Sequence, residues 1–168
     1  MAEINNEFAL AELKSKFGDD VLGSEEQYGM LTVEVSAAKA AEVAEWLRDH
    51  DRLTMNFLTD LCGVHYPDNK GKELGVVYHF HSWMNNYRLR VKAFCSIDNP
   101  QVPTLTGVYA SANWMERETF DFYGIQFQGH PDLRRILNMD EMDYHPLRKE
   151  YALEDETRED KDDRYFGR

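Results

Sequence analysis

The sequence predicts an α+β fold with two layers, in which helices pack on one face of a mixed or antiparallel sheet and an extended C-terminal arm follows. Three observations support this prediction. Two segments in the N-terminal third carry apolar residues at helical spacing, residues 74–97 alternate apolar and polar side chains as strands do, and regular periodicity disappears after residue 138. Helices and strands in this order are typical of a sheet covered by helices on one side.

The first predicted elements are a helix over residues 6–17 and two strands within residues 21–35. Gly18 ends the helix, because glycine adopts the left-handed conformation easily. Three side chains mark the apolar face of this helix: Phe8, Leu13 and Phe17. In the second strand, aliphatic residues alternate with polar ones, which predicts one buried face.

A second helix is predicted from Ser36, a suitable N-cap, to a terminus near His50. Its buried stripe consists of four side chains: Ala40, Val43, Trp46 and Leu47. The next stretch, residues 53–65, is expected to be irregular or only partly extended. Residues 67–71 contain the proline, asparagine and glycine that favour a loop.

The strongest β pattern, residues 74–97, predicts a hairpin. Apolar and polar residues alternate on both sides of Asn85 and Asn86, and asparagine tolerates the positive φ of a tight turn. A two-residue turn at these asparagines places Phe80 opposite Val91. The apolar faces of the two strands then coincide, which favours this register because a shift by one residue would turn one strand over.

Residues 114–151 combine charged, aromatic and turn-forming residues more densely than any other part of the chain. They begin with a predicted helix, for which Gly124 is the expected C-cap and on which Arg117 and Asp121, four apart, can pair. The candidate site residues of this helix are Trp114, Glu116, Arg117, Glu118 and Asp121. Two further groups follow: His130, Pro131, Arg134 and Arg135, and then Pro146, Leu147, Arg148 and Lys149. Because unpaired buried charges are unfavourable, these residues form either an intrachain ion network or a contact with another subunit.

The spacing of these residues resembles the signature of one protein family. Glu-Arg-Glu-x-x-Asp-Phe-Tyr begins at Glu116, His130 follows after six residues and Arg134 after three more, and Ile-Leu ends the pattern at residues 136–137. This run is similar to the signature of the 30-kDa subunit family, the bacterial C subunit, of proton-translocating NADH–quinone oxidoreductase, which is respiratory complex I. A Pro-Leu-Arg-Lys element follows, and Glu150 stands where the family usually has aspartate, which keeps the charge.

The resemblance implies a structural subunit of the quinone-reducing module in the peripheral arm of that complex, with neither a cofactor nor catalytic residues of its own. FMN, the iron–sulfur clusters and the quinone are then expected in partner subunits. The expected partners are the large quinone-site polypeptide, which is the D subunit of the 49-kDa type, and the iron–sulfur subunits B and I. The resemblance also implies a peripheral position on the cytoplasmic side of a bacterial inner membrane. Residues 1–125 then form the α+β domain, and residues 126–168 an arm that docks on neighbouring subunits.

Two alternatives remain open. Equivalent subunits occur in ferredoxin-linked complexes of the NDH type and in membrane-bound hydrogenases, and the signature does not separate them from the respiratory enzyme. A metal hydrolase would instead use His79 and His81, which point to the same side of one strand. The predicted register places His81 opposite Arg90 and His79 opposite Lys92, and neighbouring cations oppose metal binding. The sequence contains no phosphate loop, nucleophile elbow or zinc-protease helix.

Bulk properties indicate a chain that dissolves in water. The net charge of −12 argues against nucleic acids and anionic membrane surfaces as partners. No apolar run approaches the ~20 residues that span a bilayer, and the acidic N-terminus resembles neither a secretory signal nor a transit peptide, which favours a bacterial source. Cys62 and Cys95 are too few to hold an iron–sulfur cluster by the usual set of thiolates, and they indicate a reducing compartment.

Overall fold

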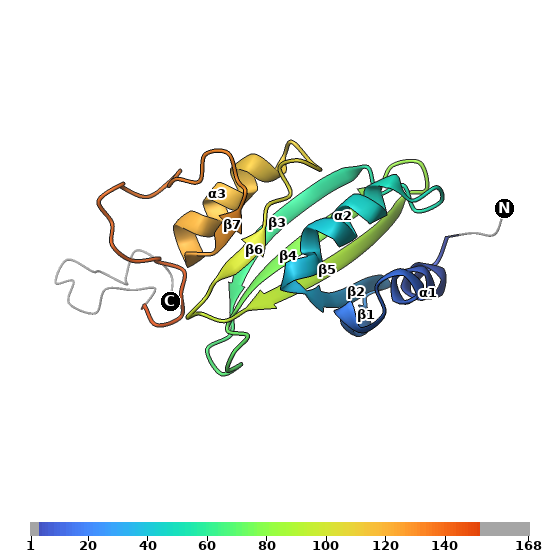
Figure 1. The fold of residues 1–168 in the computed structure, drawn as a ribbon, viewed down its shortest axis with the longest axis horizontal. Coiled ribbons are helices and arrows are strands. Elements are labelled where there is room, and N and C mark those ends of the chain that lie inside the picture. The colour runs from blue at the N-terminus through green and yellow to red at the C-terminus, as the bar shows by residue number, and fades with distance from the viewer. Residues whose placement is uncertain (1–3, 152–168) are drawn as a thin grey trace, which may run out of the picture.

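The computed structural model describes residues 4–151 of the 168-residue chain and confirms the predicted α+β architecture (Figure 1). Its main elements, in chain order, are α1 (Asn6–Phe17), β1 (Val21–Gln27), β2 (Met30–Ser36), α2 (Ala40–Asp49), β3 (Phe57–His65), β4 (Leu74–Ser82), β5 (Tyr87–Cys95), β6 (Gln101–Pro103), α3 (Ala112–Tyr123) and β7 (Gln126–Gln128). Short 3₁₀ helices cover Gly18–Asp20 and Ala37–Lys39. The end of the predicted arm, residues 152–168, lies outside the described residues.

Five strands form one mixed sheet in the order β1-β2-β5-β4-β3. Within it, β1 and β2 pair antiparallel, and so do β5 with β4 and β4 with β3. Strands β2 and β5 run parallel, so this one pairing joins the N-terminal hairpin to the three later strands. Strands β6 and β7 form a separate two-stranded parallel sheet.

The hydrophobic core lies between the five-stranded sheet and helices α1 and α2, which cover the same face of the sheet (Figure 1). Leu13 of α1 and Leu47 of α2 are fully buried. They belong to one cluster with Val33 of β2, Tyr78 of β4 and Val91 of β5. Each of these strands sends alternate side chains into the cluster, which explains why a period of two was visible in the sequence.

The predicted helix over residues 6–17 is confirmed, and both of its ends have a clear cause. The side-chain oxygen of Asn5 accepts a hydrogen bond from a backbone N–H of the first turn, and Gly18 follows the helix with a φ of 51°. The second helical segment begins directly after Ser36, as predicted, but its first turn is a 3₁₀ turn and its α-helical part starts only at Ala40. Ser36 pairs with Phe94 as the last residue of β2 and makes no capping hydrogen bond, and a 3₁₀ turn of three residues precedes α2.

The expectation of an irregular or only partly extended stretch over residues 53–65 is confirmed in part, because residues 57–65 are extended, but they form a regular strand. Strand β3 has nine residues and pairs antiparallel with β4 at the edge of the sheet. A bulge between Leu58 and Asp60 interrupts its register. The extra residue shifts the alternation of buried and exposed side chains by one position, which hides the strand from a search for a period of two.

The β4–β5 hairpin forms as predicted, but its register differs by two residues. The turn spans residues 83–86, so Phe80 lies opposite Leu89 and not opposite Val91. A shift of two residues leaves every side chain on the predicted face. Asn85 stabilises the longer turn, because its side-chain amide donates hydrogen bonds of 2.8 and 3.3 Å to two backbone carbonyl oxygens of the α2–β3 connection.

Candidate partner interface

Helix α3 is the predicted signature helix, and it packs along β3 at the edge of the sheet (Figure 1). Gly63 of β3 permits this approach, because a Cβ atom there would collide with the ring of Tyr123. Gly124 ends α3 with a φ of 77°, which confirms the predicted C-cap. Gly124 also meets later parts of the chain, since a Cβ atom there would lie 2.6 Å from both His145 and Arg148.

Residues 129–151, here called the strap, contain no helix or strand but are tied to α3 by polar contacts. Asp121 makes the largest number of these contacts. Its carboxylate is fully buried and accepts hydrogen bonds of 2.8 to 3.1 Å from the backbone N–H groups of residues 136–138. Arg135 adds an ion pair at 2.7 Å. Burial opposes ionisation of this carboxyl, but these donors together hold the pKa of Asp121 well below its ordinary value.

Two arginines satisfy backbone carbonyl oxygens where the strap crosses α3. Arg117 is buried and donates to the carbonyl oxygens of Arg134 and Arg135, at 3.2 and 3.0 Å. The Arg135 guanidinium donates in turn to two further carbonyl oxygens of the strap, at 2.6 and 2.9 Å. Arg117 and Asp121, which were predicted to pair with each other, therefore each bind the strap instead.

The end of the strap binds the last turn of α3 and the end of β3. The Arg148 side chain and the backbone N–H of Leu147 donate to carbonyl oxygens of α3 at 2.8 and 3.2 Å. Nδ1 of His145 lies 3.0 Å from another carbonyl oxygen of this helix. The backbone N–H of Lys149 donates to Nδ1 of His65 at 3.0 Å. The strap is thus fixed at both ends without secondary structure of its own.

Glu116 points away from the strap, into the layer between α3 and the segment before it. Its carboxylate is fully buried and accepts hydrogen bonds from the Thr104 hydroxyl, at 2.5 Å, and from the backbone N–H of Leu105, at 2.6 Å. Burial raises the pKa of Glu116 to about 7, although the two hydrogen bonds act in the opposite direction. This residue therefore joins α3 to the chain that follows β6.

The predicted interface residues fall into groups by exposure. The buried ones, which make intrachain contacts, are Glu116, Arg117, Asp121 and Gly124. The half-buried ones are His130, Arg135, Pro146 and Arg148. The exposed ones are Trp114, Glu118, Pro131, Arg134, Leu147 and Lys149. For the buried group the structure shows an intrachain network, whereas contact with another subunit stays a prediction for the exposed group.

The predicted interface residues left out four exposed apolar side chains of the strap, although the signature itself contains Leu137. They are Leu137, Met139, Tyr144 and Tyr151, with exposed fractions of 65%, 69%, 40% and 39%. The available signal was a set of apolar residues scattered through an acidic segment without regular periodicity. Such a segment does not form a hydrophobic core of its own that would bury them. Asn138 was also missed, although its backbone and side-chain N–H groups both bind Asp121.

The other candidate pairs do not converge on a site. His79 faces Arg90 rather than Lys92, and Arg90 donates to its Nε2 atom at 2.9 Å. Cys62 is exposed on one face of β3, whereas His65 is buried on the other. Within the described part of the chain, no three metal-binding side chains of the His, Cys, Asp or Glu type gather in one place. Over the same residues, none of the helices has both the length and the apolar character needed to cross a bilayer.

The fold and the strap together define a class of protein, an α+β domain whose last helix holds an irregular C-terminal segment through the residues of the signature. The family model of the 30 Kd subunit of respiratory-chain NADH dehydrogenase matches residues 33–157. The chain belongs to this family, which confirms the resemblance seen in the signature.

Several relatives and solved structures are similar to this chain. The NADH-quinone oxidoreductase C subunit of Roseiflexus sp. strain RS-1 is 43% identical over 150 residues, which cover 89% of this chain and 86% of the relative. The second such C subunit of Rhizobium etli is 41% identical over 85% of this chain and 75% of its own length. A solved trypsin-resistant fragment of Nqo5 is 31% identical, with a TM-score of 0.62 over 76% of this chain and 98% of the fragment. A chain of an archaeal membrane-bound sulfane sulfur reductase, 22% identical with a TM-score of 0.65 over 88% of this chain and 85% of its own, shares the fold.

Proposed function

We propose that this chain is a structural subunit of an NADH–quinone oxidoreductase, located in the quinone-reducing module of its peripheral arm, and that it supplies no catalytic residue. The strap and the exposed residues of α3 dock on neighbouring subunits, chiefly the 49-kDa-type quinone-site subunit and the iron–sulfur subunits B and I. FMN, the iron–sulfur clusters and the quinone belong to partner subunits. These partners hold the chain on the cytoplasmic side of a bacterial inner membrane, where the complex couples electron transfer to proton translocation.

The contrast between the two sides of the strap carries this proposal. Its inner side is tied to α3 through Asp121, Arg117 and Arg148, so the segment is ordered before any partner binds. Its outer side exposes Leu137 and Met139 by 65% and 69%. An ordered segment that presents apolar side chains loses little entropy on association, which suits it to bind protein.

Replacing both Leu137 and Met139 with aspartate tests the proposal. In a tagged chain that replaces the original in its host, we expect the double variant to co-purify at least about tenfold less of the quinone-site and iron–sulfur subunits, a loss of roughly 1.4 kcal/mol or more. Because both side chains are exposed, we expect the isolated variant to unfold at the same temperature as the original chain. Leu22→Asp on β1 is the matched control, since Leu22 is 51% exposed and lies outside the strap.

Two results would count against the proposal. Full assembly of the double variant would show that the strap is not an interface. A variant of any exposed strap residue that assembles completely but loses NADH–quinone turnover would contradict the structural role, because a purely structural residue changes turnover only through assembly.

The choice of NADH as electron donor rests on the relatives rather than on the fold. The relatives at about 40% identity carry the name NADH-quinone oxidoreductase, which supports NADH over ferredoxin. The likeness to the sulfane sulfur reductase supplies the fold alone and favours no second function. An NADH-oxidising flavoprotein subunit in the purified assembly is the expected result, and its replacement by a ferredoxin-binding or hydrogenase subunit would contradict this choice.

A further inference from the structure

The face of the five-stranded sheet opposite α1 and α2, here called the open face, carries no helix within the described part of the chain. Alternation along β5 sends Leu89 and Val91 into the core, so Arg88 and Arg90 lie on the open face. The side chains of β4 that stand opposite these arginines lie there as well. This surface is separate from the strap.

Two arginine–histidine pairs lie at the end of the open face next to the β4–β5 turn. His81 stands opposite Arg88, and His79 stands opposite Arg90. Among the described residues, neither arginine forms an ion pair, and Asp60 approaches only His79, at 3.6 Å. Arg90 donates to Nε2 of His79, and burial lowers the pKa of this imidazole, so His79 is neutral and adds no compensating negative charge. The two guanidinium groups are therefore without an ion-pair partner among the described residues of a chain whose net charge is −12.

Exposed apolar side chains border these cations at the β4–β5 turn. Phe57, Trp83 and Met84 are 41%, 66% and 82% exposed, and the Trp83 ring packs edge-on against Phe57 at 5.6 Å between centroids. The turn is well fixed, because Asn85 binds the α2–β3 connection and the side chain of Asn56 accepts from the backbone N–H of Trp83 at 3.3 Å. The backbone that carries Trp83 and Met84 is thus fixed before a partner arrives.

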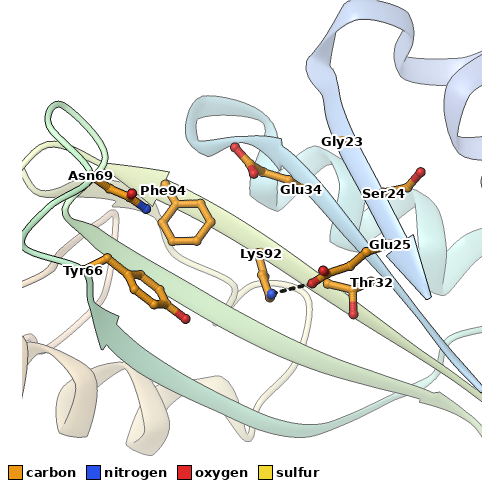
Figure 2. Close-up of a pocket in the computed structure, with 9 residues that line it drawn as sticks. All are labelled: Gly23, Ser24, Glu25, Thr32, Glu34, Tyr66, Asn69, Lys92 and Phe94. Carbon is orange, nitrogen blue, oxygen red and sulfur yellow. Dashed lines mark hydrogen bonds and ion pairs between the residues drawn. The ribbon is translucent and has the colours of Figure 1, made fainter. Parts of the chain in front are cut away.

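The opposite end of the open face is neutralised by the chain itself. A pocket of about 340 Å³ lies there between β1, β2, β5 and the loop after β3 (Figure 2). Lys92 pairs with Glu25 at 2.8 Å, as the dashed line in Figure 2 shows, and nearby Lys72 pairs with Glu34 at 2.6 Å. The unmatched positive charge is therefore confined to the end that carries the two arginines and the exposed aromatic residues.

We propose that the open face around Arg88 and Arg90 binds an acidic segment of a partner polypeptide, with an apolar side chain of that segment packed on Trp83. The charges identify this occupant, because guanidinium groups without a carboxylate bind carboxylates by paired, charge-assisted hydrogen bonds. Arginine beside exposed tryptophan and methionine is also typical of the centre of a protein interface. A nucleic acid fits less well, since its phosphates would meet a strongly acidic chain.

A photo-crosslinking amino acid in place of Met84 tests this inference in the assembled complex. After irradiation of membranes from the native host, we expect a crosslink to a partner polypeptide beside two or more aspartate or glutamate residues, located by mass spectrometry. Adding Arg88→Glu to the same chain is expected to lower the crosslink yield at least about tenfold, because a matching charge becomes a repulsive one. Lys14→Glu makes the same charge change on exposed α1 and is expected to leave the yield unchanged.

Crosslink yield is normalised to the amount of co-purified subunits, which separates this inference from the role of the strap. If the crosslink is lost while co-purification stays constant, the result tests the open face alone. If the strap variant loses co-purified subunits, the result tests the proposed function. Four results overturn the inference: no crosslink in an assembled complex, a crosslink to a basic or uncharged segment, a crosslink to nucleic acid or lipid, or a yield that Arg88→Glu does not change.

Discussion

The carboxyl group of Glu116 is placed where neither solvent nor a cation of the described residues stabilises its charge. Its two hydrogen bonds, to Thr104 and Leu105, fix the start of α3 against the chain that follows β6. Burial raises its pKa to about 7, so the group changes protonation state close to neutral pH. The signature residue Glu116 thus has an internal role, in agreement with the intrachain alternative that the sequence left open, although its partners are neutral hydrogen-bond donors.

The substitution Glu116→Gln removes this titratable group, and we expect it to change how the free energy of unfolding depends on pH. The unfolded carboxyl has a pKa near 4.5 and the folded one near 7, so the folded chain binds more protons in this window and its stability falls as the pH rises through it. The difference amounts to about 3 kcal/mol at most. Urea unfolding is expected to show a more stable variant at about pH 8 and little difference at about pH 4.5. The amide resembles the protonated carboxyl, because its oxygen accepts from the backbone N–H of Leu105 and its N–H donates to the Thr104 hydroxyl oxygen. A difference that is constant with pH would disprove this account.

Alanine at Gly124 is expected to destabilise the chain for two reasons. Its φ of 77° is unfavourable for residues with a Cβ atom, and that atom would lie 2.6 Å from His145 and Arg148. Gly71 is a matched control, since it shares the positive φ but has no neighbour within 4 Å. We expect Gly71→Ala to cost about 1 kcal/mol from the backbone and Gly124→Ala about 2–4 kcal/mol, measured by urea unfolding of the isolated chain. Equal losses at the two positions would exclude the contact with the strap as a cause.

At the scale of elements, the strap depends on α3 for its order. Asp121→Asn replaces a carboxylate that accepts several N–H groups with an amide that presents N–H groups of its own. We expect trypsin to cleave after Arg135 at least about tenfold faster in this variant, because local opening of the strap becomes easier by roughly 1.4 kcal/mol or more. Cleavage after Lys70, in the loop after β3, serves as the internal reference. An unchanged ratio of the two rates would show that Asp121 does not hold the strap.

Helices and strands that are determined by residues close together in the sequence could be predicted. The helix over residues 6–17 and the faces of the β4–β5 hairpin follow from periodicity, and the end of α3 follows from the glycine at position 124. Strand β3 was missed because a bulge breaks its alternation. The hairpin register was wrong because Asn85 binds a segment more than thirty residues away, which favours a four-residue turn that local rules do not predict.

The site was predictable in its residues but not in its geometry. The signature correctly marked Asp121, Arg117 and Arg148 as charges that need partners. Their partners are mostly backbone N–H and carbonyl groups of the strap, which every residue possesses. Because these groups leave no pattern in the sequence, the route of the strap could not be derived before the structure was known.

On the scale of the whole molecule, the chain protects both edges of its sheet. Helix α3 packs along β3, and β1 carries Glu25 and Glu26 together with a register shift between Val21 and Gly23. Charged residues and bulges on an edge strand discourage pairing with other chains. Association is therefore expected through the strap and the open face, where apolar side chains are exposed, and not through extension of the sheet.

The parallel pairing of β2 with β5 also has a consequence for biosynthesis. Strand β5 is central in the sheet, yet it is the last of the five to leave the ribosome. One backbone edge of β2 stays unpaired until residue 95 has emerged, because no earlier strand pairs with that edge. During this interval the nascent chain presents an unpaired strand edge, which is the kind of surface at which incompletely folded chains associate.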